Sequence, residues 1–236
     1  MNSFKVIITL IFLCLGLTGG CDNTAKDSYF PLEEGRYWQY DMTYTTMDGT
    51  FKGIYAVENL APQMIEGEKV FVRRLIDGAN NYVRINDEGI LLIGREKTID
   101  MDSTYTQENH YIFRFPLVVG TTWEEVIPSK LLVKTGPPQK TEFHIVARVP
   151  VTATIESMTD SVQVPAGNFS NCMRVHFSGD AFTNAGNYVG LTVVTIEETN
   201  WYAPGTGLVK SVRRETTRSK ALDKGMMTLE LRQVKQ

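Results

Sequence analysis

The strongest restriction on the fold of this chain is a steady alternation between short β-prone runs and turn signals. Runs rich in Val, Ile, Thr, Tyr and Phe recur about every ten to fifteen residues, and no stretch after the N-terminal apolar segment keeps a helical period. Asp48-Gly49 and Asp77-Gly78 predict hairpins, because both dipeptides tolerate the positive φ of tight turns. The predicted strands are Tyr37–Thr46, Phe51–Glu58, Lys69–Ile76, Tyr82–Ile85, Ile90–Arg95, Tyr111–Phe115, Thr122–Ile127, Glu142–Ser157, Asp160–Val164, Asn171–Ser178, Tyr188–Tyr202, Leu208–Thr217 and Met226–Gln233.

Alternation within these runs indicates the type of sheet. Val194, Ile196 and Glu198 fall on one face of a strand, while the residues between them fall on the other. Such half-polar alternation favours an antiparallel sheet with one wet side. A polar segment, Thr98 to Asn109, interrupts the pattern, and Lys134–Lys140 contains a Gly-Pro-Pro that blocks both helix and ladder. We interpret the second segment as a long hairpin loop and not as a domain boundary.

One motif occurs twice along the chain. Phe30-Pro31-Leu32, Gly35 and Trp38 recur at identical spacing as Phe115-Pro116-Leu117, Gly120 and Trp123. In each copy Pro presets an extended entry, Gly permits a turn and Trp begins a strand. The repeat indicates either a duplicated unit or a recurrent way of starting a strand, and two copies do not separate these interpretations.

The N-terminus has the pattern of an export signal. A single Lys5 precedes an apolar run from Val6 to Leu17, which is too short to span a bilayer well but is typical of a signal-peptide core. We therefore predict a signal peptide over residues 1–20; a buried N-terminal helix is the alternative. Leu17-Thr18-Gly19-Gly20 stands before Cys21 and resembles the lipobox of bacterial lipoproteins, although Thr18 occupies the place where that box usually has Leu.

The lipobox resemblance implies that Cys21 carries the lipid of a mature lipoprotein. Two or three acyl chains anchor a protein firmly, because each buried methylene contributes about 0.8 kcal/mol. Residues 21–28 are polar and read as a flexible tether, and residues 29–236 as a single β domain. The expected location is the bacterial cell envelope, on the periplasmic or extracellular face of a membrane. Ordinary secretion, with Cys21 free or in a disulfide, is the alternative.

Three longer segments resemble a family of uncharacterised bacterial lipoproteins. These segments are Tyr29–Tyr40, Val162–Val175 and Trp201–Lys210, which carry the patterns FPLxxGxxW, VPAGxF and WYAPGxGLVK in this order. The resemblance implies a mainly β fold with little helix: a strongly curved antiparallel sheet, or an open half-barrel like those of lipoprotein carriers and periplasmic lipid-binding proteins. It supplies no catalytic residues.

The sequence contains no recognised catalytic or metal-binding motif. The three histidines, His110, His144 and His176, lie at no recognised spacing to a carboxylate or thiol, although a sheet could bring them together. No Gly-x-Ser-x-Gly elbow is present, and Cys172 lies in an apolar run typical of a buried, inert cysteine. We therefore predict no enzyme activity, no catalytic residues, no metal and no cofactor.

Adjacent carboxylates in this sequence do not form acid–base pairs. There are three such pairs: Glu33-Glu34, Glu124-Glu125 and Glu197-Glu198. On a strand the two side chains of each pair point to opposite faces, so they cannot act together in one reaction. Carboxylates from distant strands could still meet. The net charge of −3 and the absence of a basic block argue against nucleic acid as a partner.

Aromatic residues near the motifs allow two interpretations. They could line a cleft for an apolar ligand or a sugar, but in sheet proteins such residues more often fill the core, which we favour here. The set is Tyr37, Trp38, Tyr40, Tyr44, Trp201 and Tyr202.

Three hypotheses of function follow, and the interior of the sheet separates them. A non-enzymatic envelope lipoprotein that binds a hydrophobic ligand or a partner protein predicts a deep apolar cavity on the concave face. A structural or assembly lipoprotein predicts a filled core and an exposed apolar patch. A hydrolase, the third hypothesis, predicts a polar pocket that collects titratable side chains.

Overall fold

The computed structural model describes residues 29–99, 102–136, 141–220 and 222–235. The predicted signal peptide, Cys21 and the tether lie outside these ranges. Within them, no helix combines the length and apolar character needed to cross a membrane.

The domain is built around one antiparallel sheet of 12 strands, as the fold prediction required. The strands run in the order β6-β5-β4-β3-β2-β1-β14-β13-β12-β11-β10-β7, and β8 and β9 form a separate hairpin. In chain order the elements are β1 (Tyr37–Thr46), β2 (Gly49–Ile65), β3 (Glu68–Leu75), β4 (Asn80–Asn86), β5 (Gly89–Ile99), β6 (Asp102–Arg114), β7 (Thr122–Pro128), β8 (Val133–Gly136), β9 (Thr141–His144), β10 (Arg148–Val164), β11 (Gly167–Asn184), the single-turn α2 (Gly186–Val189), β12 (Leu191–Ala203), β13 (Gly207–Thr217) and β14 (Lys224–Lys235).

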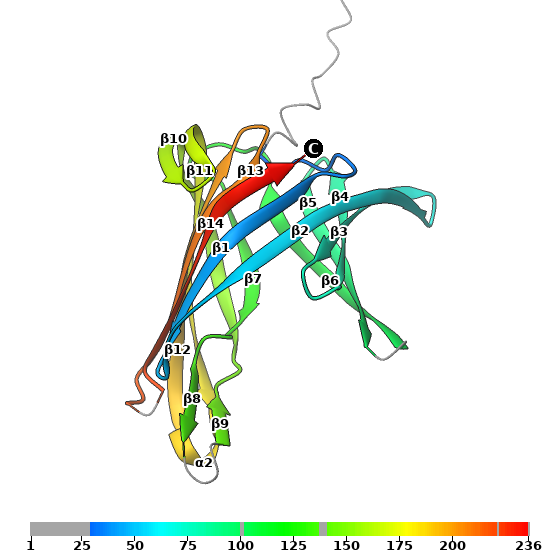
Figure 1. Cartoon of the computed structure of the whole chain (residues 1–236). Coiled ribbons are helices and arrows are strands. Elements are labelled where there is room, and N and C mark those ends of the chain that lie inside the picture. The colour runs from blue at the N-terminus through cyan, green and yellow to red at the C-terminus, as the bar shows by residue number, and fades with distance from the viewer. Residues whose placement is uncertain (1–28, 100–101, 137–140, 221, 236) are drawn as a thin grey trace, which may run out of the picture.

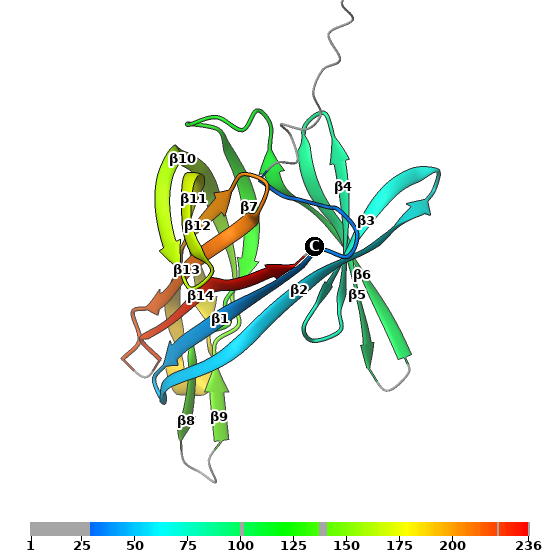
Figure 2. The same ribbon diagram turned by 45° about the horizontal axis from the view of Figure 1, so that its top comes forward.

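The sheet is so strongly curved that its two edge strands face each other (Figures 1 and 2). Antiparallel pairing of β1 with β14 joins the first and last strands of the domain, from Tyr37 opposite Lys235 to Thr45 opposite Met226. At the other junction β6 and β7 are the edges of the sheet and have no ladder between them in the described chain. The fold is therefore a nearly closed ring of strands with one open seam, between β6 and β7.

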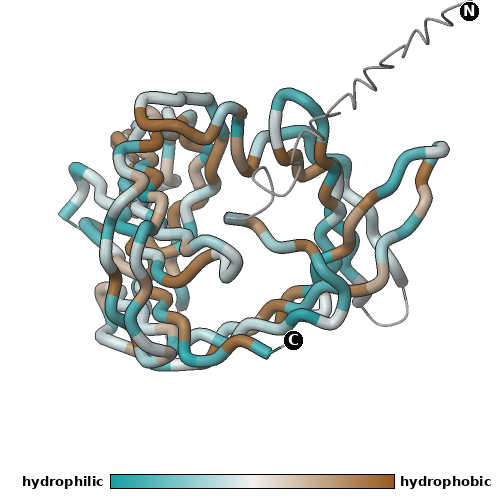
Figure 3. The backbone as a smooth tube through the Cα atoms, turned by 90° about the horizontal axis from the view of Figure 1, so that it is seen from above, coloured by the Kyte–Doolittle hydropathy of each residue, from teal (hydrophilic) through white to brown (hydrophobic). Residues whose placement is uncertain are grey.

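The inner face of the ring holds the main hydrophobic core. Seen from above, the strands encircle a central space, and the first described residues of the chain run into it (Figure 3). Phe30 packs edge-on against Phe113 of β6, with ring centroids 5.9 Å apart. Arg73 of β3 lies over the ring of Phe30 at 4.0 Å and donates to the carbonyl of Pro31 at 2.7 Å. Phe30 and Pro31 thus fill part of the space inside the ring, held by ring contacts and by a hydrogen bond from a charged donor.

The two motif copies form the same turn at their glycines, although the Phe115-Pro116 peptide bond is cis and the Phe30-Pro31 bond is trans. Gly35 and Gly120 both have positive φ, 78° and 92°. The Gly35 amide donates to Asn59 of the next strand, and the Gly120 amide donates to Ile155 in the same way. Trp38 lies at the start of β1, which pairs with β2, and Trp123 lies at the start of β7, which pairs with β10.

Each copy is followed by a meander: β1 to β6 after the first copy, and β7 with β10 to β14 after the second. Identical hydrogen bonds and matching strand order support a duplicated unit. In that arrangement the open β6–β7 seam is the counterpart of the paired β14–β1 junction.

Several predicted strand boundaries were wrong. The polar segment Thr98 to Asn109 is not a break: it forms most of β6, whose side chains are largely exposed at the sheet edge. The predicted run from Glu142 to Ser157 is interrupted after β9, and β10 then continues to Val164, across the predicted gap before Asp160, through irregular pairing with β11. A polar edge strand has no alternation for a sequence pattern to detect.

The prediction of a loop at Lys134–Lys140 is wrong for its first three residues, because Lys134, Thr135 and Gly136 belong to β8, which pairs with β9 as a hairpin. Residues 137–140, which contain the Pro-Pro, lie outside the described residues. Thr135 ties this hairpin to the turn between β1 and β2, because its backbone amide and its hydroxyl both donate to the Asp48 carboxylate, at 2.8 and 2.9 Å.

Candidate functional site

The open seam is bridged at two points by side chains. Phe113 of β6 and Trp123 of β7 meet edge-on, with ring centroids 6.4 Å apart. Further along, His110 Nε2 lies 3.4 Å from Glu125 Oε1. Backbone pairing is replaced here by one aromatic contact and one polar contact, so this junction is weaker than the β1–β14 ladder.

A pocket of about 370 Å³ lies beside these contacts, inside the curve of the sheet, and we call it the seam pocket. Its volume is at the lower end of the range for small-molecule sites. Most of its lining side chains are polar or charged: Asn81, Arg95, Glu108, His110, Glu125, Lys130, Arg148, Glu198, Asn200, Tyr202 and Arg213, with Leu92, Ile112, Val126, Ile127, Pro128 and Phe177 as the apolar part.

Strand alternation explains why β12 and β13 supply so much of this lining. Glu198, Asn200 and Tyr202 are two residues apart and therefore share the inner face of β12. Arg213 stands opposite Glu198 on β13, and Glu215 is the next inward residue. The predicted alternation around Glu198 is confirmed, and it carries charge into the interior.

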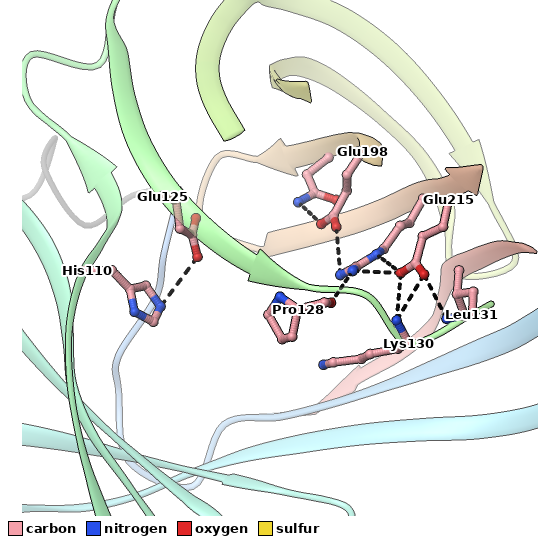
Figure 4. Close-up of polar contacts among 9 residues, drawn as sticks. His110, Glu125, Pro128, Lys130, Leu131, Glu198 and Glu215 are labelled. Carbon is pink, nitrogen blue, oxygen red and sulfur yellow. Dashed lines mark hydrogen bonds and ion pairs between the residues drawn. The ribbon is translucent and has the colours of Figure 1, made fainter. Parts of the chain in front are cut away.

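Glu215 fixes the floor of the pocket. Its side chain has 0% exposure, and its carboxylate accepts from the backbone amides of Lys130 and Leu131 at 2.9–3.0 Å. Arg213 adds a bond from Nε to the same carboxylate at 2.8 Å. Figure 4 shows these bonds converging on one carboxylate. These hydrogen bonds compensate the cost of burying the Glu215 charge. Through them Glu215 holds Lys130 and Leu131, which follow β7, against β13.

Arg213 connects this floor to the functional part of the pocket. Its guanidinium also donates to the carbonyl of Pro128 at 2.6 Å and lies 3.6 Å from Glu198. Glu198 in turn accepts a hydrogen bond from Asn200 Nδ2 at 2.8 Å. The Glu198 carboxylate is therefore positioned by two neighbours before any ligand arrives.

Glu125 is the most perturbed carboxyl of the pocket. Its pKa is raised to about 7 by burial, with smaller increases from the nearby Glu198 and Glu108 carboxylates, while the Arg213 guanidinium opposes the rise. Burial lowers the pKa of His110, against the effect of Glu108. An acid shifted upward therefore touches an imidazole shifted downward, and the pair can hold or release a proton near neutral pH.

Two further groups respond to the enclosed setting. Burial, together with Arg213 and Arg95, lowers the pKa of Lys130. Burial and the two carboxylates Glu198 and Glu125 raise the pKa of Tyr202, which keeps its phenol neutral. Tyr202 also packs edge-on against Phe113 at 4.7 Å, so it joins the pocket to the aromatic core.

Two buried acceptors in the lining have no partner among the described residues: Asn200 Oδ1 and Asn81 Oδ1. Asn200 is only 6% exposed. An unpaired buried acceptor costs about 1–3 kcal/mol, so a hydrogen-bond donor supplied by a ligand would be stabilising here.

Sequence reasoning found few of these residues. It noted Glu125 and Glu198 only as members of adjacent pairs, and the structure brings these two together from distant strands, as had been left open. The three histidines do not converge: His144 lies beside Glu142, and His176 contacts Thr199. Among the described residues no group of three or more His, Cys, Asp or Glu side chains is placed to hold a metal ion.

The other singled-out residues have structural roles or lie elsewhere. Trp38 and Tyr40 are buried in a second core cluster, as the core interpretation predicted. Cys172 is buried in the same cluster, and burial raises the pKa of its thiol. Cys21 lies outside the described residues, so its lipidation stays a prediction. A larger groove, of about 590 Å³ and similarly open, lies beside Tyr82 and Tyr105 and lacks comparable buried charge.

Comparison with known proteins gives structural similarity only. No family model matches the chain, and no curated protein matches it. A crystal structure provisionally described as a lipoprotein of Parabacteroides distasonis is 14% identical, with 88% of this chain and 98% of that chain covered and a TM-score of 0.43.

Two further solved structures are similar in the same way. An exported protein of Bacteroides fragilis with a YmcC-like fold is 14% identical over 88% and 99% of the two chains, with a TM-score of 0.39. A domain described as an outer membrane lipoprotein-sorting protein, from Vibrio parahaemolyticus, is 8% identical over 89% and 88%, with a TM-score of 0.27. These scores are too low to assign the chain to a family or a function.

Proposed function

We propose that this chain is a lipoprotein of the bacterial cell envelope, without catalytic activity, whose β domain binds a small polar ligand in the seam pocket. The observation that carries the binding role is the pocket itself: a partly open, mostly polar site with buried acceptors that have no hydrogen-bond donor among the described residues. A hydrophobic ligand, one of our expectations, would fit an apolar cavity better than this lining.

The envelope location rests on the sequence. Cys21 follows a small-residue stretch and an apolar export signal, and the predicted tether joins it to the domain. Radioactive palmitate should label the wild-type protein in cells and leave a Cys21→Ser variant unlabelled. Equal labelling of the two proteins would refute lipid anchoring at Cys21.

Native mass spectrometry of the protein purified from its own envelope tests the binding role. We expect a small molecule to be retained by the wild type and lost from an Asn200→Ala variant, which lacks the buried acceptor. Circular dichroism and thermal unfolding of the variant show whether it is folded, and Asn81→Ala provides a second, less buried test. A retained protein in place of a small molecule would support the accessory-subunit hypothesis.

One observation favours a second candidate, a hydrolase. Glu125 has a raised pKa and lies near Glu198, and two carboxylates in unequal environments can serve as acid and base. No Ser, Thr or Cys lines the seam pocket, so a nucleophile would have to be water or a carboxylate. Turnover of a retained ligand by wild type, and its accumulation in a Glu125→Gln variant, would favour this candidate over binding alone.

A further inference from the structure

The deep side of the seam pocket offers hydrogen-bond acceptors. Asn200 Nδ2 donates to Glu198 Oε1, which fixes the orientation of the amide and leaves Oδ1 as the free end. Glu125 and Glu198 line the same space, each with side chains only 17% exposed. Three acceptor groups therefore line one pocket: Asn200 Oδ1 has no donor among the described residues, and the two carboxylates have further acceptor capacity beside their contacts with His110, Asn200 and Arg213.

An ammonium group matches these acceptors in number and in charge. It has three N–H donors and no acceptor, so it can bond Glu125, Glu198 and Asn200 Oδ1 at once. It would also reduce the repulsion between the two carboxylates, which at present are only partly compensated by Arg213. The alternative cation, a metal ion, lacks a cluster of ligands in the described chain.

The open side of the pocket has the opposite character. Its exposed lining residues Lys130 and Arg148 are basic, and among the described residues neither side chain is within ion-pair distance of a carboxylate, although the Lys130 amine is screened enough from water for its pKa to be lowered. The other two cations of the lining are neutralised, Arg213 by Glu215 at 2.7 Å and Arg95 by Asp77 at 3.2 Å. In Figure 4 the Lys130 side chain extends away from Glu215 and leaves its amine free of that carboxylate.

We infer that the ligand of the seam pocket is a small zwitterion. Its amine lies among Glu125, Glu198 and Asn200, and its carboxylate or phosphate meets Lys130 and Arg148. This inference rests on the proposed binding function and narrows it to one ligand class. An amino acid and an ethanolamine phosphate headgroup share this chemistry.

Four matched probes test the inference on the full mature chain. β-Alanine carries both charges, ethylammonium and propionate each carry one, and 1-propanol carries none. Binding is followed by NMR through the His110 ring, which lies in the pocket, with the rings of His144 and His176 as internal controls outside it. We expect β-alanine to bind at least about tenfold more tightly than either single-charge probe, which corresponds to roughly 1.4 kcal/mol.

Variants divide the zwitterion into its two halves. Glu125→Gln should weaken the binding of ethylammonium and leave the binding of propionate unchanged. Lys130→Met should weaken the binding of propionate and leave that of ethylammonium unchanged. Glu124→Gln is the matched control, because Glu124 lies one residue from Glu125 but bonds Thr152 at 2.8 Å away from the pocket. O-Phosphoethanolamine, compared with β-alanine, distinguishes a headgroup source from an amino-acid source by which of the two binds more tightly.

The outcomes separate the inference from the function on which it rests. If propionate or 1-propanol binds as tightly as β-alanine, the inference of a zwitterionic ligand is wrong, while the proposal that the seam pocket binds a small molecule stands. If no probe shifts the His110 signals at its solubility limit, and native mass spectrometry finds nothing retained, both proposals are wrong.

Discussion

At the scale of single residues, the seam pocket places a carboxyl where its charge is costly. Glu125 is held near an imidazole, two other carboxylates and one guanidinium, and its pKa of about 7 is far above the usual value for Glu. The folded protein therefore keeps a proton on Glu125 that the unfolded chain has already released. Stability from this group is present at low pH and is lost as the pH rises from about 4.5 to about 7.

Replacement of Glu125 by Gln should remove that loss. From pH 5 to pH 8 we expect the wild type to lose up to about 3 kcal/mol of unfolding free energy relative to Glu125→Gln. His110 acts in the opposite sense, since its lowered pKa makes the folded state release a proton, but it is present in both proteins.

Urea unfolding at the two pH values measures the difference. Glu108, Glu198 and Arg213 also face Glu125 and are unchanged in the comparison. The control Glu124→Gln should follow the wild type. Parallel pH profiles for wild type and Glu125→Gln would show that Glu125 titrates normally.

The residues of this site could not be read from the sequence, for a physical reason. Alternation assigns Glu198 to the inner face, but only the curvature of the sheet brings it near Glu125 of β7, a strand at the edge of the sheet. No local pattern encodes that distance. The same holds for Lys130, whose position depends on the buried Glu215 carboxylate far along the chain.

At the scale of elements, prediction succeeded where strands alternate or carry strong turn signals. β1 begins and ends where predicted, and β13 differs by one residue. It failed for the first part of β6, residues 102–109, which is largely polar, and for the start of β12, where residues predicted as strand form α2. Edge exposure and turn geometry are tertiary properties, so composition alone did not show them.

One element-scale contact gives a direct test of how the pocket floor is held. Gly225 of β14 lies against the segment after β7, and a Cβ at this position would stand 2.3 Å from the carbonyl oxygen of Leu131. Gly225→Ala should therefore push Leu131 away and disturb the hydrogen bond from its backbone amide to the Glu215 carboxylate. We expect the free energy of unfolding to fall by about 1–3 kcal/mol.

Gly53→Ala on β2 is the matched control. Its Cβ would meet only the terminal methyl of Met42, at 3.2 Å, which can rotate aside. Thermal unfolding should thus show a lower midpoint for Gly225→Ala and little change for Gly53→Ala. Equal midpoints for the two variants would mean that the Leu131 segment is not tightly packed on β14.

At the scale of the whole molecule, the two meanders are joined unequally. The β1–β14 junction is a hydrogen-bonded ladder with one register shift after Gln39, whereas the β6–β7 seam is joined by the connecting loop and by side-chain contacts. If β6 paired with β7 as β1 pairs with β14, the ring would have no edge strands. The seam pocket lies where that pairing is missing. Widening of the ring at the seam would break no ladder, so the seam is the place where the ligand proposed for the seam pocket would enter.

Cutting the chain at the seam tests this division of roles. Val118 and Val119 lie in the loop between β6 and β7 and are 50% and 61% exposed, so a protease site inserted between them should be tolerated and cleaved. The two fragments should stay together on size-exclusion chromatography in native buffer, because the β1–β14 ladder and the contacts of Phe113 with Trp123 and Tyr202 still hold them. They should separate in denaturant. If they separate in native buffer, the covalent loop at the seam is what closes the ring, and the seam cannot act as the flexible entrance to the pocket.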